Sequence, residues 1–124
     1  MNTKFDQIVQ KKLNNVLILG LTFKEECNDY RNSLIFSIIK KLNQKKIFSD
    51  VFDPYLVKDI NKIKIEKKVN IKSKIPNKKY DAVLIAVSHN YFKKISLQKM
   101  KKLSKYEFIF DLKNIYKNKA SLTF

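Results

Sequence analysis

Two uninterrupted runs of apolar residues dominate the hydrophobic pattern of the chain, at 16–20 (VLILG) and at 82–87 (AVLIAV). A short apolar run without polar alternation predicts a strand that is buried on both faces, as in a parallel sheet. Shorter segments predict further strands at 50–53, 69–71 and 107–112. The pattern therefore predicts about five strands, of which two are buried on both faces.

Before and between these strands lie segments whose apolar residues recur at helical spacing, at 5–13, 34–42, 55–67 and 89–104. Such spacing gives a helix one apolar face, which can cover a sheet. Alternating strands and helices predict an α/β fold: a three-layer domain with a mostly parallel sheet and right-handed crossovers.

Composition narrows the function classes. The chain has 124 residues, enough for one domain, and Gly20 is its single glycine. One glycine excludes a G-x-G-x-x-G dinucleotide loop and a P-loop. One cysteine and one histidine exclude a Cys/His zinc site and a disulfide framework within one chain. Without a long apolar run or a secretory signal, we expect a cytoplasmic protein and no membrane partner.

The charge has two possible interpretations. Lys and Arg number 27 and Asp and Glu number 11, so the formal net charge is +16. Clustered cations bind polyanions such as nucleic acids. However, the residues that A/T-rich codons encode are abundant throughout, and Arg31 is the single arginine. The sequence favours codon composition as the source of the charge, with a polyanion-binding surface as the alternative.

Polar residues follow the predicted strands, at Gly20–Lys24, Asp53-Pro54, 88–90 and 111–113. In an open parallel sheet, ligands bind outside the carboxyl ends of the strands. The candidate functional residues are therefore expected at this edge of the sheet.

Four motifs in order carry a family resemblance: VLILGLTFKEECNDYRNS at 16–33, DVFDPY at 50–55, YDAVLIAVSHNYF at 80–92 and IFDLKNI at 109–115. Together they resemble the carboxyl-terminal, UDP-binding domain of the UDP-glucose/GDP-mannose dehydrogenase family. The match looks nearest to the branch that oxidises UDP-N-acetylhexosamines to uronic acids for polysaccharide biosynthesis.

The resemblance implies a three-part, NAD-dependent oxidoreductase of which this chain is the last part. Residues 1–14 are expected to be the tail of a central dimerisation helix, and 15–124 the Rossmann-like UDP-sugar-binding domain. NAD and the catalytic cysteine would belong to the missing parts, so Cys27 is interpreted as structural. We expect this chain to be inactive alone and to need a partner chain or a homo-oligomer. The alternatives are a non-catalytic basic module that binds a nucleotide or nucleic acid, and a non-functional gene remnant.

The resemblance also assigns the substrate-binding residues. Phe23 and Lys24 follow the first strand and are expected to reach the UDP-sugar, with Lys24 supplying a cation for the diphosphate. Lys113 is expected to face the substrate from the last strand. Asn114 stands where relatives often carry glycine. Nucleic acid is not the expected partner.

Other polar residues are expected to shape the surrounding loops. Asp29 and Arg31 are predicted to form an ion pair, and Ser33 to be a helix N-cap. Asp53 is interpreted as a turn residue and His89 as a hydrogen-bonded turn histidine rather than a general base.

Overall fold

The computed structural model describes residues 13–22, 24–31, 33–63, 69–120 and 122–123. Its strands are β1 (Asn15–Leu19), β2 (Phe48–Phe52), β3 (Val69–Lys72), β4 (Ala82–Ile85), β5 (Ile109–Asp111) and β6 (Leu122–Thr123). Its helices are α2 (Ile35–Gln44), the 3-10 helix η1 (Val57–Lys62), α3 (Asn90–Lys93) and α4 (Leu97–Lys101). No helix in this part of the chain is long and apolar enough to cross a membrane.

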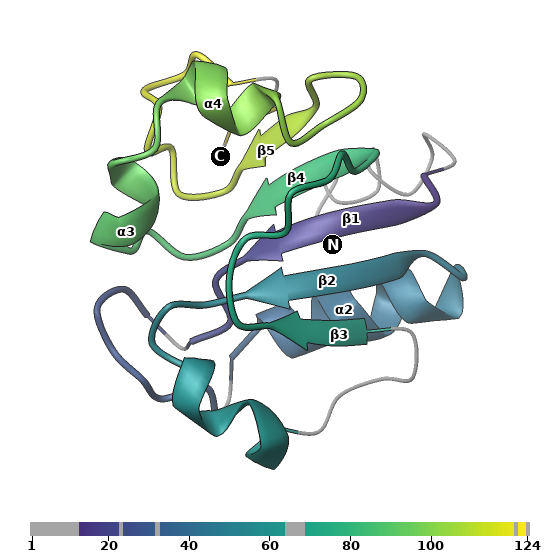
Figure 1. Ribbon diagram of the computed structural model, residues 1–124, viewed down its shortest axis with the longest axis vertical. Helices are drawn as coiled ribbons and strands as arrows, with labels where there is room; N and C mark the ends of the chain where they lie inside the picture. Colours follow the sequence, from purple (N-terminus) through teal and green to yellow (C-terminus); the bar gives the residue numbers. More distant parts are fainter. Residues whose placement is uncertain (1–12, 23, 32, 64–68, 121, 124) are drawn as a thin grey trace.

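The six strands form one sheet in the order β3-β2-β1-β4-β5-β6, and every neighbouring pair is parallel. Figure 1 shows the labelled strands side by side with their arrowheads pointing the same way. This is the doubly wound, Rossmann-like order, in which the chain direction across the sheet reverses between β1 and β4. The predicted α/β fold with a parallel sheet is confirmed.

Two apolar clusters lie on opposite faces of the sheet because successive residues of a strand point to opposite sides. Val16 and Ile18 of β1 pack with Ile39 and other residues of α2 on one face. Leu17 and Leu19 join the second cluster, which the residues of α3 and α4 complete. Figure 1 shows α2 behind the sheet, whereas α3 and α4 lie near β4 and β5. The domain therefore has the predicted three layers.

Several elements differ in detail from the sequence-based expectation. Of the helix predicted at 55–67, residues 57–62 form the 3-10 helix η1, and 64–67 lie outside the described residues. The strand predicted at 82–87 ends at Ile85, and the two-residue strand β6 was not expected. The helix predicted at 5–13 falls, except for the buried Leu13, outside the described residues.

Helix α2 ends in a Schellman motif that has a lysine where glycine is usual. Lys46 has a φ of 61°, its amide donates to the Asn43 carbonyl, and the Ile47 amide donates to the Leu42 carbonyl. Five other described residues besides glycine also have positive φ values: Glu26, Glu107, Asn114, Lys117 and Asn118. A chain with one glycine therefore places side chains in left-handed turns.

Candidate functional site

Gly20 sits where β1 leaves the sheet and comes very close to the segment after β4. Its φ is +105°, and a Cβ on it would lie 2.6 Å from the Cβ of Val87. Its amide donates to the Phe52 carbonyl at the end of β2, at 2.9 Å. The single glycine thus allows the three central strand ends to converge, because any larger residue would overlap with Val87.

The Asp53 carboxylate organises the loop that follows β1. It is 2% exposed, and Oδ2 accepts hydrogen bonds from the amides of Leu21 (2.8 Å) and Thr22 (3.1 Å). Oδ1 accepts from the Tyr55 amide at 2.9 Å. Burial alone would raise the pKa of Asp53, but hydrogen bonds from His89 and the Leu21 amide outweigh it and hold the pKa below its ordinary value. Asp53 is therefore an ionised structural anchor.

His89, which follows β4, is fully buried and joins the same network. Its Nδ1 accepts a hydrogen bond from the Glu26 amide at 3.0 Å, so this nitrogen carries no proton. Its Nε2 lies 3.0 Å from Asp53 Oδ2 and 3.0 Å from Thr22 Oγ1. The remaining ring proton thus points toward Asp53. The prediction of a hydrogen-bonded turn histidine is confirmed.

Glu26 closes the loop onto the start of α3. Its Oε1 accepts from the Asn90 side chain at 2.7 Å and its Oε2 from the Asn90 amide at 3.2 Å. Hydrogen bonds from Tyr55 and then from Asn90 lower the pKa of Glu26. The Tyr55 ring also packs on His89, with centroids 4.7 Å apart. The network therefore ties together the loops that follow β1, β2 and β4.

Asp111 plays a matching role at the end of β5. It is fully buried, and its two carboxylate oxygens accept hydrogen bonds from the amides of Ile115 (3.0 Å) and Tyr116 (2.9 Å). Asn114 adopts a φ of 54°, a left-handed conformation that asparagine tolerates better than most residues. The turn that carries Lys113 is thereby held in a defined shape.

A pocket of about 360 Å³ opens where the sheet order reverses. Lys24 and Lys113 both line it, and both are exposed. Ala86, Val87 and part of α2 also line it, together with Leu34, which is 80% exposed. Two cations from different loops therefore face one partly apolar hollow.

The other predicted loop residues have mixed outcomes. Asp29 and Arg31 form the expected ion pair, with Nε 3.1 Å from Oδ1, but both side chains are solvent-exposed. The prediction that Ser33 is the N-cap is wrong, because Leu34 is the N-cap residue of α2. The Ser33 hydroxyl nevertheless accepts a hydrogen bond from the Ile35 amide at 3.2 Å and so satisfies a free helix donor. Phe23 lies outside the described residues.

Cys27 stabilises the loop in which it lies, because its sulfur accepts a hydrogen bond from the Asp29 amide at 3.4 Å. Among the described residues, no group of three His, Cys, Asp or Glu side chains could hold a metal ion.

Sequence reasoning treated Asp53 and His89 as separate turn residues and missed that they bond to each other. Their positions directly after buried strands were the available signal.

Comparisons with known proteins agree with this geometry. The model of the UDP-glucose/GDP-mannose dehydrogenase family, UDP binding domain, matches residues 17–118. A UDP-N-acetyl-D-glucosamine 6-dehydrogenase of Salmonella typhi is 34% identical over 82% of this chain and 24% of its own length. A UDP-glucose 6-dehydrogenase of Rickettsia felis is 31% identical over 86% of this chain and 24% of its own length. The chain thus spans about a quarter of the length of these relatives.

Solved structures show the same fold. The UDP-N-acetyl-mannosamine dehydrogenase of S. aureus superposes with a TM-score of 0.68 at 30% identity, over 97% of this chain and 27% of that one. A UDP-D-ManNAc dehydrogenase of Pyrococcus horikoshii gives a TM-score of 0.70 at 19% identity, over 96% and 28%. The resemblance seen in the four sequence motifs is confirmed: the chain belongs to the UDP-glucose/GDP-mannose dehydrogenase family, as its UDP-binding domain.

Proposed function

We propose that this chain binds the UDP portion of a nucleotide sugar in the pocket between the ends of β1, β4 and β5. The observation that carries the proposal is the convergence of Lys24 and Lys113 on one hollow at the point where the sheet order reverses. A diphosphate is an anion that lysines hold as point charges. The apolar wall beside them suits the face of a uracil ring.

The same edge of the sheet does not fit NAD. In dinucleotide folds an acidic residue after the second strand binds the ribose, and a glycine-rich loop receives the pyrophosphate. Here Asp53 is 2% exposed and its oxygens already accept hydrogen bonds from Leu21, Thr22, Tyr55 and His89. We therefore propose that NAD binds to another domain, and we assign no redox step to this chain.

Under this assignment, the chain contributes to catalysis by binding the substrate. In the complete enzyme, a UDP-hexose or UDP-N-acetylhexosamine would be oxidised at its primary alcohol to a uronic acid. The nucleophile and the hydride acceptor would come from a partner chain or from further domains, and the dimer from the central helix. We propose a cytoplasmic setting, where these soluble sugar nucleotides and NAD occur.

Thermal unfolding in the presence of UDP tests the proposal. A ligand at tenfold its Kd stabilises a protein by about 1.4 kcal/mol, which raises the Tm of a domain of this size by roughly 4–6 °C. We expect UDP to give such a shift and NAD to give none. The variants Lys24→Gln and Lys113→Gln should each weaken the UDP effect, whereas Lys58→Gln, on η1, should not. Equal UDP affinities for all three variants would contradict the assignment of this pocket.

A further inference from the structure

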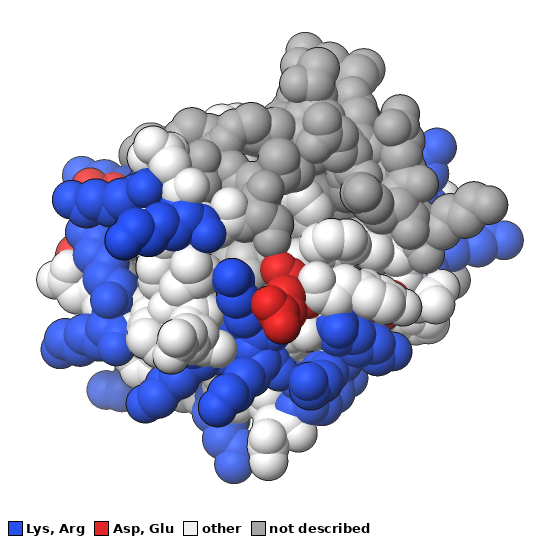
Figure 2. All heavy atoms as spheres, turned by 90° about the horizontal axis from the view of Figure 1, so that it is seen from above, with Lys and Arg blue, Asp and Glu red and all other residues white. Residues whose placement is uncertain are grey.

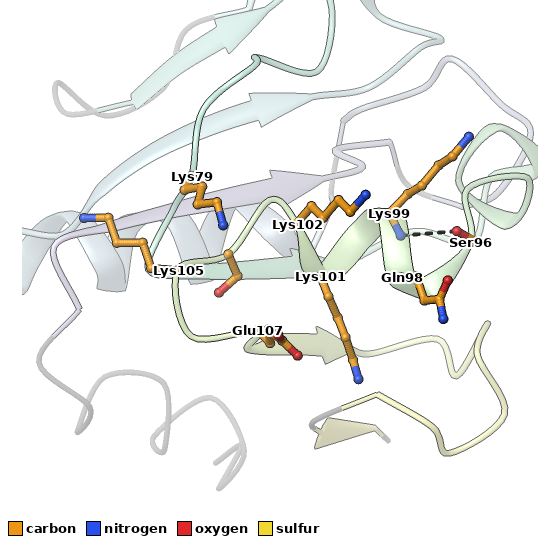
Figure 3. A pocket seen from close by; sticks show the side chains of 9 residues that line it. Lys79, Ser96, Gln98, Lys99, Lys101, Lys102, Lys105 and Glu107 are labelled. Atoms are coloured by element: carbon orange, nitrogen blue, oxygen red, sulfur yellow. Dashed lines mark hydrogen bonds between the residues drawn. The ribbon is translucent and has the colours of Figure 1, made fainter.

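A second, larger hollow lies away from the UDP pocket, around α4 and the segments that precede β4 and β5. Its volume is about 570 Å³. Five of its nine lining residues are lysines, whereas the whole chain has 26 lysines among 124 residues. The lysines are Lys79, Lys99, Lys101, Lys102 and Lys105. Figure 3 shows Lys79 on the segment before β4, Lys99, Lys101 and Lys102 on or just after α4, and Lys105 on the turn that follows.

Acidic groups balance little of this charge. Among the described residues, Glu107 is the one acidic residue that lines the hollow. Lys105 Nζ lies 3.6 Å from Asp81 Oδ1, a largely buried carboxylate below the surface. Figure 2, which looks at the molecule from above, shows lysines spread around a few acidic side chains on this side. The local field is therefore strongly positive and accessible to a polyanion.

A second hollow of about 310 Å³ lies beside the first, and Lys105 lines both. The second hollow adds Lys78, whose Nζ lies 3.5 Å from the Asp50 carboxylate in the same lining, and the amide-bearing residues Asn14, Asn15 and Asn70. These lysines and asparagines precede β1, β4 or β5 or lie near the starts of β1 and β3, so the two hollows lie along the amino-terminal side of the sheet. We call them the amino-edge groove.

Two exposed aromatic side chains accompany the lysines. Tyr106 is 60% exposed and lies between Lys105 and Glu107 in sequence, while Phe48 lines the second hollow and is 54% exposed. The Tyr106 ring contacts Phe108 in a tilted arrangement with centroids 5.8 Å apart, so the protein holds this exposed ring beside the residues that line the first hollow.

We propose that the amino-edge groove binds single-stranded nucleic acid. A groove of this kind combines cations that follow the phosphate backbone with aromatic rings on which unpaired bases stack. Lysines alone would suit any polyanion, but exposed rings among them favour a strand whose bases are accessible. The proposal goes beyond UDP-sugar binding and involves neither Lys24 nor Lys113.

The first test is the salt dependence of binding to a fluorescein-labelled oligo(dT) 12-mer, measured by anisotropy on the full chain with excess UDP present. Each phosphate contact contributes about 0.7 to the slope of log K against log salt. The triple variant Lys79→Gln, Lys99→Gln, Lys102→Gln should therefore lower the slope by about 2. Its affinity at 50 mM salt should fall by at least about tenfold.

A matched control separates the groove from the overall charge. The triple variant Lys40→Gln, Lys58→Gln, Lys93→Gln changes the net charge equally, with exposed lysines on α2, η1 and α3. Its slope should stay within about 0.5 of the wild-type slope. Equal losses in the two triple variants would overturn the proposal, because codon composition would then explain the binding.

The second test addresses stacking. Tyr106→Ala should lower the affinity by at least about fivefold, whereas Tyr106→Phe, which keeps the ring, should bind like the wild type. Far-UV circular dichroism and urea unfolding establish that each variant is folded. A duplex of equal length that binds more tightly than the single strand, or an absence of saturable binding at 50 mM salt, would also overturn the proposal.

Discussion

Replacing Asp53 with asparagine tests whether the buried network holds the strand ends together. The wild-type carboxylate accepts hydrogen bonds from the amides of Leu21, Thr22 and Tyr55 and faces His89 Nε2. An asparagine side chain has one accepting oxygen and one donating nitrogen in place of two accepting oxygens. In either orientation, at least one buried N–H group therefore faces another donor.

The expected loss follows from these contacts. One buried donor without an acceptor costs about 1–3 kcal/mol, and the other hydrogen bonds lose the extra strength that a charged acceptor provides. We expect Asp53→Asn to lower the free energy of unfolding by about 3 kcal/mol. That is a large share of the roughly 6–19 kcal/mol typical of a chain of this length.

Urea unfolding followed by circular dichroism measures this loss. Asp59→Asn is the matched control, because Asp59 is part-exposed and its ion pair with Lys62 is 3.8 Å long. It should change the unfolding free energy by less than about 0.5 kcal/mol. If Asp53→Asn destabilised no more than the control, the network would not be what fixes the loops.

Acid unfolding gives an independent readout of the same group. Because the folded-state pKa of Asp53 is depressed, its stabilisation is present above its unfolded pKa of about 3.9. The stabilisation is lost as the pH falls through the lower, folded-state pKa. The wild type should therefore lose stability below about pH 4 more steeply than Asp53→Asn does. Parallel pH curves for the two proteins would argue against an ionised Asp53.

Three further substitutions extend the test. Gly20→Ala places a Cβ 2.6 Å from Val87 at a φ of +105°, so urea unfolding should show a loss of about 2–5 kcal/mol; a loss under 1 kcal/mol would refute the close approach. Tyr80→Phe removes a buried 2.6 Å hydrogen bond to Asp50 and should cost about 1.5–3 kcal/mol by the same assay, while a neutral effect would contradict that bond. Arg31→Ala breaks a solvent-exposed ion pair and should leave the urea midpoint unchanged; a lowered midpoint would give the pair a structural role.

The sequence predicted the central elements well because they are long apolar runs. Residues 16–20 and 82–87 have no polar alternation, so burial on both faces was the simple interpretation. The short elements outside these two apolar runs were harder to predict. The helical spacing at 55–67 is weak, and η1 within it has six residues. β6 has two residues, too few for any periodic signal.

The candidate site was predicted in outline only. The motifs brought Lys24 and Lys113 to one pocket, but the buried network among Asp53, His89 and Thr22 is a set of contacts between residues 31 to 67 positions apart. Such pairings depend on the order of strands in the sheet, which hydrophobic periodicity does not encode. The concentration of lysines along the amino-edge groove was hidden for the same reason.

The Schellman turn after α2 has a consequence for engineering this domain. A lysine held at a φ of 61° costs about 1–2 kcal/mol more than in a right-handed conformation, whereas glycine adopts that angle without a steric penalty. Even after glycine's greater loss of backbone entropy, Lys46→Gly leaves a net gain on the order of 0.5 kcal/mol. Glu107 and Lys117 have similar left-handed backbone angles, with φ values of 57° and 55°. The scarcity of glycine thus leaves a reserve of stability in the turns, which thermostabilising substitutions could recover without altering the proposed UDP pocket.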